Sequence, residues 1–144
     1  VQFIVMLLIG KNILPLLGLP ALVIGNAYIA ILLVALSSCL AATGFGILTG
    51  TIFQTHQQAA TFGSVSVVLL AAIGGIWVPL YIMPPVLQLI GKISPLNWGL
   101  EAFNTLFLRA GQLSDVIPYI FASLLFFVIT FAISMLIEKR RARV

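Results

Sequence analysis

Few side chains in this sequence are of the kinds that carry out chemistry. A catalytic nucleophile needs a base beside it, and a zinc site needs several His, Cys, Asp or Glu ligands. The sequence has one histidine, His56, and one cysteine, Cys39, and its three acids are far apart: Glu101, Asp115 and Glu138. A proton or a metal at His56 is conceivable, but without a neighbouring carboxylate or second ligand a solvated role is favoured. We expect no catalytic residue, no metal ion and no enzymatic activity.

The sequence also lacks a loop that binds nucleotide phosphates. Such a loop contains Gly-Lys followed directly by Ser or Thr. The two Gly-Lys pairs here are followed by Asn12 and by Ile93. The chain is therefore expected to bind no nucleotide cofactor and to hydrolyse none.

The composition indicates which solvent surrounds the chain. Its 144 residues are 62% hydrophobic and 7% charged, against roughly 45–50% and 25% in soluble domains. No charged residue lies between Lys11 and Lys92, a stretch too long to be hidden in one soluble core. Four of the seven basic residues lie in the last six positions, which is typical of a segment that flanks a membrane. We predict that the partner of this surface is the lipid bilayer and not nucleic acid.

The apolar runs divide into membrane spans. About 20 helical residues cross a bilayer, and the polar run Gln54–Gln58 should lie at its surface. The predicted fold is an all-α integral membrane protein with three full transmembrane helices, at residues 22–53, 60–81 and 116–137. Residues 1–10 are too short to span, and Lys11-Asn12, followed by Pro15, Gly18 and Pro20, favours a turn that closes this helix. We interpret 1–10 as the end of a fourth, truncated span.

Residues 84–110 differ in character from these spans. Pro84 stops one helix, and Ser94 and Pro95 stand at the N-cap and first position of another. Trp98 and Glu101 add the aromatic and charged side chains of a membrane interface. We predict an outer re-entrant helical hairpin before the last span. Glu101 is a functional candidate if it lies in hydrocarbon, although pairing with Lys92 or a backbone group is favoured.

The basic tail sets the predicted orientation. Lysine and arginine next to a span are retained on the cytoplasmic side. Residues 138–144 should therefore form a cytoplasmic tail in the cell (inner) membrane, with residues 82–114 outside and 54–58 inside.

Two features of the spans suggest specific roles. Small residues recur every fourth position and should form a helix-packing face: Ser38, Ala42, Gly46 and Gly50. Ordinary helix contact and a moving transport interface both fit this face. In the second full span, glycines and a proline bracket two bulky residues, which predicts a kink and an outer gate at Gly74, Gly75, Ile76, Trp77 and Pro79. Trp77 as an interface anchor is the alternative.

An ordered series of short motifs resembles the C-terminal half of the export-type permeases of the type-2 ATP-binding-cassette family. The motifs are Gly44–Leu48, Thr55–Ala59, Gly74–Pro79, Met83–Gln88, Ser94–Trp98 and Glu101–Phe103. The resemblance implies the last three of six spans, the end of the third, and outer re-entrant helices between spans five and six. It also implies a second permease copy, the same or different, and an ATP-binding cassette ATPase, separate or fused, on which ATP is bound. An ATPase-independent transporter or channel, or a membrane scaffold, is the alternative function.

Overall fold

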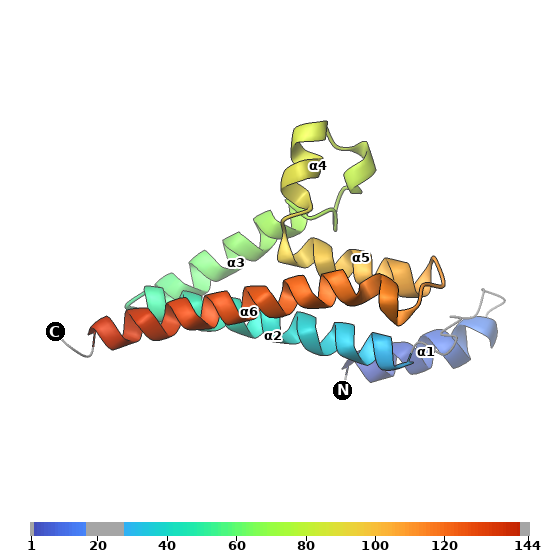
Figure 1. Ribbon diagram of the computed structural model, residues 1–144, viewed down its shortest axis with the longest axis horizontal. Helices are drawn as coiled ribbons and strands as arrows, with labels where there is room; N and C mark the ends of the chain where they lie inside the picture. The colour runs from blue at the N-terminus through green and yellow to red at the C-terminus, as the bar shows by residue number, and fades with distance from the viewer. Residues whose placement is uncertain (1, 17–27, 142–144) are drawn as a thin grey trace.

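The computed structural model describes residues 2–16 and 28–141, and every regular element in these ranges is helical. The elements in chain order are α1 (Gln2–Leu16), α2 (Tyr28–Ile52), α3 (His56–Ile73), the 3-10 helix η1 (Leu80–Ile82), α4 (Pro85–Gly91), α5 (Pro95–Phe107) and α6 (Leu113–Arg141). Figure 1 shows α2 and α6 side by side, with α3 diverging from them and α4 standing apart.

Three of these helices are long and apolar enough to cross a bilayer: α2 with 25 residues, α3 with 18 and α6 with 29. At 1.5 Å per residue, even α3 is about 27 Å long, close to the roughly 30 Å of a hydrocarbon core. Large apolar side chains along α2 and α6 point away from the protein; Leu36 is 53% exposed and Phe121 66%. The predicted all-α membrane fold with three full spans is confirmed, and the protein is a multi-pass membrane protein.

Helices α2 and α6 contact each other along a seam of small residues. The buried positions of α2 include Ala30, Val34, Ser37, Ala41 and Gly44, which alternate by four and three. On α6 the buried residues Val116, Ser123 and Thr130 recur every seven positions, and Ser134 follows. A period of 3.5 residues is that of two helices wound around each other, and small side chains let the backbones approach closely.

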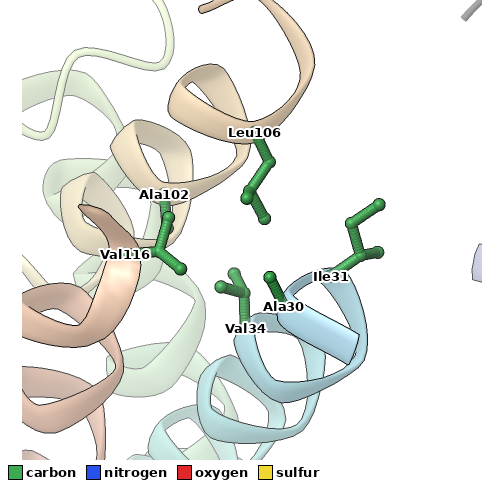
Figure 2. Close-up of a cluster of buried hydrophobic side chains, with 6 residues drawn as sticks. All are labelled: Ala30, Ile31, Val34, Ala102, Leu106 and Val116. Atoms are coloured by element: carbon green, nitrogen blue, oxygen red, sulfur yellow. The ribbon is translucent and has the colours of Figure 1, made fainter. Parts of the chain in front are cut away.

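A small apolar core lies where three helices meet. Figure 2 shows Ala30, Ile31 and Val34 of α2 facing Ala102 and Leu106 of α5 and Val116 of α6. Each of these side chains is at most 3% exposed. The core anchors α5 to the paired spans at the end opposite the basic tail, and so positions the segment between α3 and α6.

Several boundaries differ from those predicted. Helix α1 runs through Lys11, Asn12 and Pro15 to Leu16, so the predicted turn is wrong for these residues, whereas Gly18 and Pro20 lie outside the described residues. Pro15 is the last residue but one of α1, where a proline removes only one hydrogen bond of the helix. Of the span predicted at 22–53, the structure describes α2 from Tyr28 to Ile52, and residues 22–27 lie outside the described residues.

The polar run between the first two spans is mostly helical. Thr55 is the N-cap of α3, and its hydroxyl accepts a hydrogen bond of 3.3 Å from the Gln58 backbone N–H. His56, Gln57 and Gln58 therefore form the first turn of α3. Their side chains are exposed there, although the backbone is helical and not a loop. This places the start of the span predicted at 60–81 four residues earlier.

Helix α6 extends beyond the predicted span 116–137 at both ends. It begins at Leu113 and includes residues 138–141 of the predicted tail, whereas residues 142–144 lie outside the described residues. Near its end, an Arg141 guanidinium nitrogen donates a 2.9 Å hydrogen bond to the Ile52 carbonyl oxygen. This bond satisfies an unpaired carbonyl at the C-terminus of α2 and ties the two helix ends together.

Candidate functional site

The candidate site is the junction formed by the end of α3, the short helices η1, α4 and α5, and the first turns of α6. It begins where α3 stops. Gly75 has a φ of +88°, and the Ile76 backbone N–H donates a 3.1 Å hydrogen bond back to the Ala71 carbonyl oxygen. A left-handed glycine followed by this bond is a Schellman helix end. The span predicted at 60–81 therefore ends at Ile73, and the predicted kink at Gly74 and Gly75 is instead a helix terminus.

Two buried side chains at the start of α5 complete the end of α3. The amide nitrogen of Asn97 donates a 2.9 Å hydrogen bond to the Gly74 carbonyl oxygen. The Ser94 hydroxyl donates a 3.2 Å bond to the Leu70 carbonyl oxygen. Asn97 is 3% exposed and Ser94 4%. The Gly74 carbonyl has no partner within the helix, so Asn97 supplies a bond that the bilayer cannot. The Leu70 carbonyl oxygen already accepts the Gly74 N–H at 2.8 Å, and Ser94 adds a second bond to it.

Ser94 is thus the N-cap of α5 by position only. Its side chain makes no capping bond to its own helix, since the hydroxyl is committed to α3. Pro95 occupies the first helical position of α5 as predicted. In α4 the first helical position is Pro85, and Pro84 is the N-cap before it. The sequence analysis missed the bonds from Ser94 and Asn97 to α3, because their partners are more than 20 residues away in the chain.

Trp98 connects three of the surrounding elements. Its indole N–H donates a 2.7 Å hydrogen bond to the Lys92 carbonyl oxygen, at the C-cap of α4. Its ring also meets Phe126 of α6 edge-on, with 6.3 Å between ring centroids. Gly91 lets α4 approach α3, because a Cβ there would lie 2.6 Å from the Ile73 carbonyl oxygen. The two short helices predicted at 84–110 are present, and these contacts fix them to the end of α3.

Glu101 pairs with Arg109 and not with the predicted partner Lys92. One Glu101 carboxylate oxygen lies 3.6 Å from an Arg109 guanidinium nitrogen, and the two side chains are 28% and 65% exposed. Arg109 follows the end of α5 at Phe107, where the chain turns back and the Gly111 N–H bonds to the Thr105 carbonyl oxygen at 2.9 Å. This turn brings Arg109 within reach of Glu101.

Two cavities lie on either side of this junction. The first, called the polar cavity, has a volume of about 850 Å³. Most of its wall is apolar, but it also carries charged, amide and phenol groups, among them those of Lys92, Glu101, Asn104, Arg109 and Tyr119. An apolar cavity of about 420 Å³ is lined by Phe45, Phe103 and Phe126 together with smaller apolar groups. Leu100 lines both cavities. The junction therefore offers a polar and an apolar space next to each other.

The predicted gate residues separate in the structure. Ile76 lines the apolar cavity, whereas Gly75 and Pro79 line the polar one. Trp77 is 66% exposed and Ile76 47%. Both bulky residues lie after the end of α3, so a bend of that helix does not carry them. A gate at these positions stays a prediction.

The predicted packing face, Ser38 to Gly50, is not the face that α2 presents to α6. Ser38 lies against α5, where a Cβ added to Gly99 would be 3.3 Å from its hydroxyl oxygen, and this hydroxyl has no hydrogen-bond partner among the described residues. A Cβ at Gly46 or Gly50 would meet nothing within 4 Å. The C-terminal part of the face, with Gly46 and Gly50, borders a wedge-shaped space of about 390 Å³ between α2 and α3. On α3 this space is lined by further small residues, Ala59, Ala60 and Gly63.

Titratable groups do not gather elsewhere in the described part of the chain. No three His, Cys, Asp or Glu residues there are placed to hold a metal ion. Cys39 and His56 are both exposed on the surfaces of α2 and α3.

Comparison with known proteins places the chain in a family. The model of the ABC-2 type transporter family matches residues 1–108. The chain is similar to the linearmycin resistance permease protein LnrN of Bacillus subtilis (strain 168), with 27% identity over 108 residues. These residues are 75% of this chain and 28% of that relative, so the chain matches little more than a quarter of the relative's length. No solved structure matches the chain. The chain belongs to the ABC-2 type transporter family.

Proposed function

We propose that this chain is part of the permease subunit of an ATP-driven exporter, which acts as a dimer with an ATP-binding cassette ATPase. The family match over residues 1–108 carries this proposal. Membership makes the chain a membrane transport component, and members of the family generally work with such an ATPase. Export, the dimer and the ATPase go beyond the match.

Open surfaces on the spans support a larger assembly. Gly46 and Gly50 on α2 face the wedge opposite Ala60 and Gly63 on α3, and no described residue fills it. Two facing rows of small residues allow close approach of another helix. We propose that the part of the predicted face around Gly46 and Gly50 packs against a helix outside this chain, of the same subunit or of a second copy.

The basic end of α6 supports a cytoplasmic position for the C-terminus. Lys139, Arg140 and Arg141 occupy its last described turn, and basic residues that flank a span are retained in the cytoplasm. The bond from Arg141 to the Ile52 carbonyl oxygen places the connection between α2 and α3 at the same end. In the proposed orientation this connection faces the ATPase, and the junction of α3, α4 and α5 lies on the outer side.

The first experiment tests whether the permease forms a complex with an ATPase. The full-length permease, purified in mild detergent with a candidate ATPase expressed beside it, should elute as an assembly of two permeases and two ATPases. Light scattering and quantitative gel densitometry give the stoichiometry. A permease that is folded and purifies alone, with every candidate ATPase from the same genomic neighbourhood left behind, would favour the channel or scaffold alternative.

We propose that Ile76 alone, and not Ile76 together with Trp77, forms the outer gate. Because Ile76 lines the apolar cavity and Trp77 is the more exposed, Ile76→Ala should widen the cavity, and Trp77→Ala should only weaken an interface anchor. We expect Ile76→Ala to uncouple export from ATP hydrolysis by several-fold, with hydrolysis preserved. Trp77→Ala is the matched comparison, and equal effects of the two variants on coupling would contradict this assignment.

A further inference from the structure

We infer that the two cavities at the junction together bind one phospholipid, with its phosphodiester headgroup in the polar cavity and an acyl chain in the apolar cavity. This goes beyond export, because the lipid would be a bound component of the permease and not its cargo. The inference uses the lining of the cavities, their depth along α6 and their shared wall.

The lining of the polar cavity fits a phosphate group. Lys92 and Arg109 contribute two positive charges and Glu101 one negative charge, so the lining residues leave a net charge of +1 (2 − 1). Glu101 lies 3.6 Å from Arg109, whereas no ion pair within 4.0 Å is recorded for the Lys92 ammonium group among the described residues. An ammonium group and a guanidinium group are the side chains that bind phosphate oxygens most strongly. Asn104 and Tyr119 add neutral hydrogen-bonding groups.

The lining of the apolar cavity fits a hydrocarbon chain. Phe45, Phe103 and Phe126 line it from three different helices. Its one hydroxyl-bearing residue is Ser38, whose oxygen is inaccessible to solvent. One hydroxyl is fewer than the two to four polar partners that hold an ordered water. An acyl chain would fill it with contacts of the same kind as those of the bilayer.

The depths of the two cavities match the two parts of a lipid. The apolar run of α6 starts at Val116, after Asp115. The polar cavity reaches α6 at Pro118, Tyr119 and Ala122, which lie within about 10 Å of the start of that run along the helix axis. The apolar cavity reaches α6 at Phe126, about 10 Å deeper than Tyr119. Headgroup and hydrocarbon regions follow each other over such a distance at a membrane surface.

In the proposed site the lipid reaches from one cavity to the other across Leu100, which borders both. Leu100 lines both cavities, and Trp98, which lines the polar one, touches Phe126, which lines the apolar one. A bound phosphodiester lipid would therefore lie beside the indole of Trp98. This proximity gives the site a local spectroscopic reporter.

The test measures quenching of Trp98 by brominated lipids in the full-length permease, reconstituted in phosphatidylcholine nanodiscs. The Trp98 signal is the fluorescence difference between the protein and its Trp98→Phe variant. Phosphatidylglycerol with brominated acyl chains should quench this signal at a several-fold lower membrane fraction than brominated diacylglycerol, which lacks the phosphate. Two charge contacts near a membrane surface correspond to roughly a tenfold or larger change in affinity, so Lys92→Gln with Arg109→Gln should abolish the preference.

Matched variants and a soluble competitor make each outcome decisive. Lys92→Arg with Arg109→Lys keeps both charges and should keep the preference, and Lys92→Gln alone serves if the double variant is not recovered folded. Equal quenching by the two lipids in the unchanged protein would show ordinary lipid contact and overturn the inference. Displacement of the lipid by millimolar glycerol phosphate would identify a free-phosphate site and overturn the lipid assignment. None of these readouts requires export or ATP hydrolysis, so they stand or fall separately from the proposed function.

Discussion

Gly44→Leu is expected to separate α2 from α6 and to remove most of the folded protein. A Cβ at Gly44 would lie 2.5 Å from the Thr130 hydroxyl oxygen and 3.3 Å from the Phe127 Cα. Thr130 cannot turn away freely, because its hydroxyl is hydrogen-bonded to the carbonyl oxygens of Phe126 and Phe127, at 2.8 and 3.0 Å. The backbone contact can be relieved only if the helices move apart. Overpacking of this kind costs about 1–3 kcal/mol, and a leucine adds three further carbons to the clash.

The measurement is the yield of monodisperse full-length protein, compared with that of Gly46→Leu. Gly46 lies two residues further along α2, and a Cβ there meets nothing within 4 Å in this chain. The two variants therefore have the same change in helix propensity and hydrophobicity but different surroundings. We expect the yield of Gly44→Leu to fall at least several-fold and that of Gly46→Leu to hold. Equal yields of folded protein would contradict the seam between α2 and α6.

Gly46→Leu also tests the proposed outer packing face. If another helix lies against Gly46, the folded variant should lose dimer or ATPase subunit during purification, because the leucine holds that helix away. A folded and active Gly46→Leu complex at normal levels would show that α2 is exposed to lipid at Gly46.

Asn97→Asp is expected to open the junction between α3 and α5. The substitution keeps the shape of the side chain but replaces its amide donor with an oxygen, 2.9 Å from the Gly74 carbonyl oxygen. At neutral pH this would bury a carboxylate against a carbonyl at a position that is 3% exposed. A lost bond with an unsatisfied buried group costs about 1–3 kcal/mol, and more when the group is charged. The protein should therefore lose several degrees or more of thermal stability.

The defect should also depend on pH in one direction. Burial beside a carbonyl raises the carboxyl pKa of an aspartate at this position, and the protonated form can donate a hydrogen bond to the Gly74 carbonyl oxygen. For a group whose folded-state pKa is raised, stability is lost as pH rises through the unfolded and then the folded value. Asn97→Asp should thus recover stability relative to the unchanged protein as the pH is lowered.

Hydrogen exchange and a control on the same helix complete this test. Backbone amides of residues 74–82 should exchange faster in Asn97→Asp, because the end of α3 is no longer held. Asn104→Asp makes the same chemical change two turns later, at a residue that lines the polar cavity and whose side chain makes no hydrogen bond to another described residue. It should leave both stability and exchange nearly unchanged. Similar destabilisation by both variants would mean that added negative charge, and not the bond to Gly74, is responsible.

The parts of this fold that the sequence predicts are those set by local rules. The charge-free run after Lys11 requires several spans, Pro84 stops one helix, and Pro95 fits the first position of another. These features depend on the solvent and on neighbouring residues alone. Accordingly the three spans and the two short helices of 84–110 are present in the structure, although their depth in the membrane remains a prediction.

Features that depend on distant partners were beyond the sequence analysis. The end of α3 is set by the left-handed conformation of Gly75 and by the bond from Asn97, which is 23 residues away from Gly74. From the sequence alone, two glycines before Pro79 fit a kink as well as an end. Similarly, Glu101 forms its ion pair with Arg109 and not with Lys92, because the turn after α5 places the arginine close to Glu101.

The small-residue seam was missed although the sequence contains its signal. Counting every fourth residue from Ser38 selects one edge of α2, whereas the contact with α6 follows Ser37, Ala41 and Gly44, which alternate by four and three. A period of 3.5 fits two helices in lengthwise contact better than a period of four. The same count on α6 gives Val116, Ser123 and Thr130.

Transport coupled to ATP hydrolysis tests the central claim most directly. The full-length permease and its ATPase would be reconstituted in vesicles with the nucleotide sites outside, and uptake of a candidate apolar cargo would be followed with and without ATP. We predict uptake that requires ATP, stops when the ATPase is inactivated by substitution of its phosphate-loop lysine, and is absent without the permease. Uptake at the same rate without ATP, or with the inactive ATPase, from an intact complex would contradict the account and identify a passive channel.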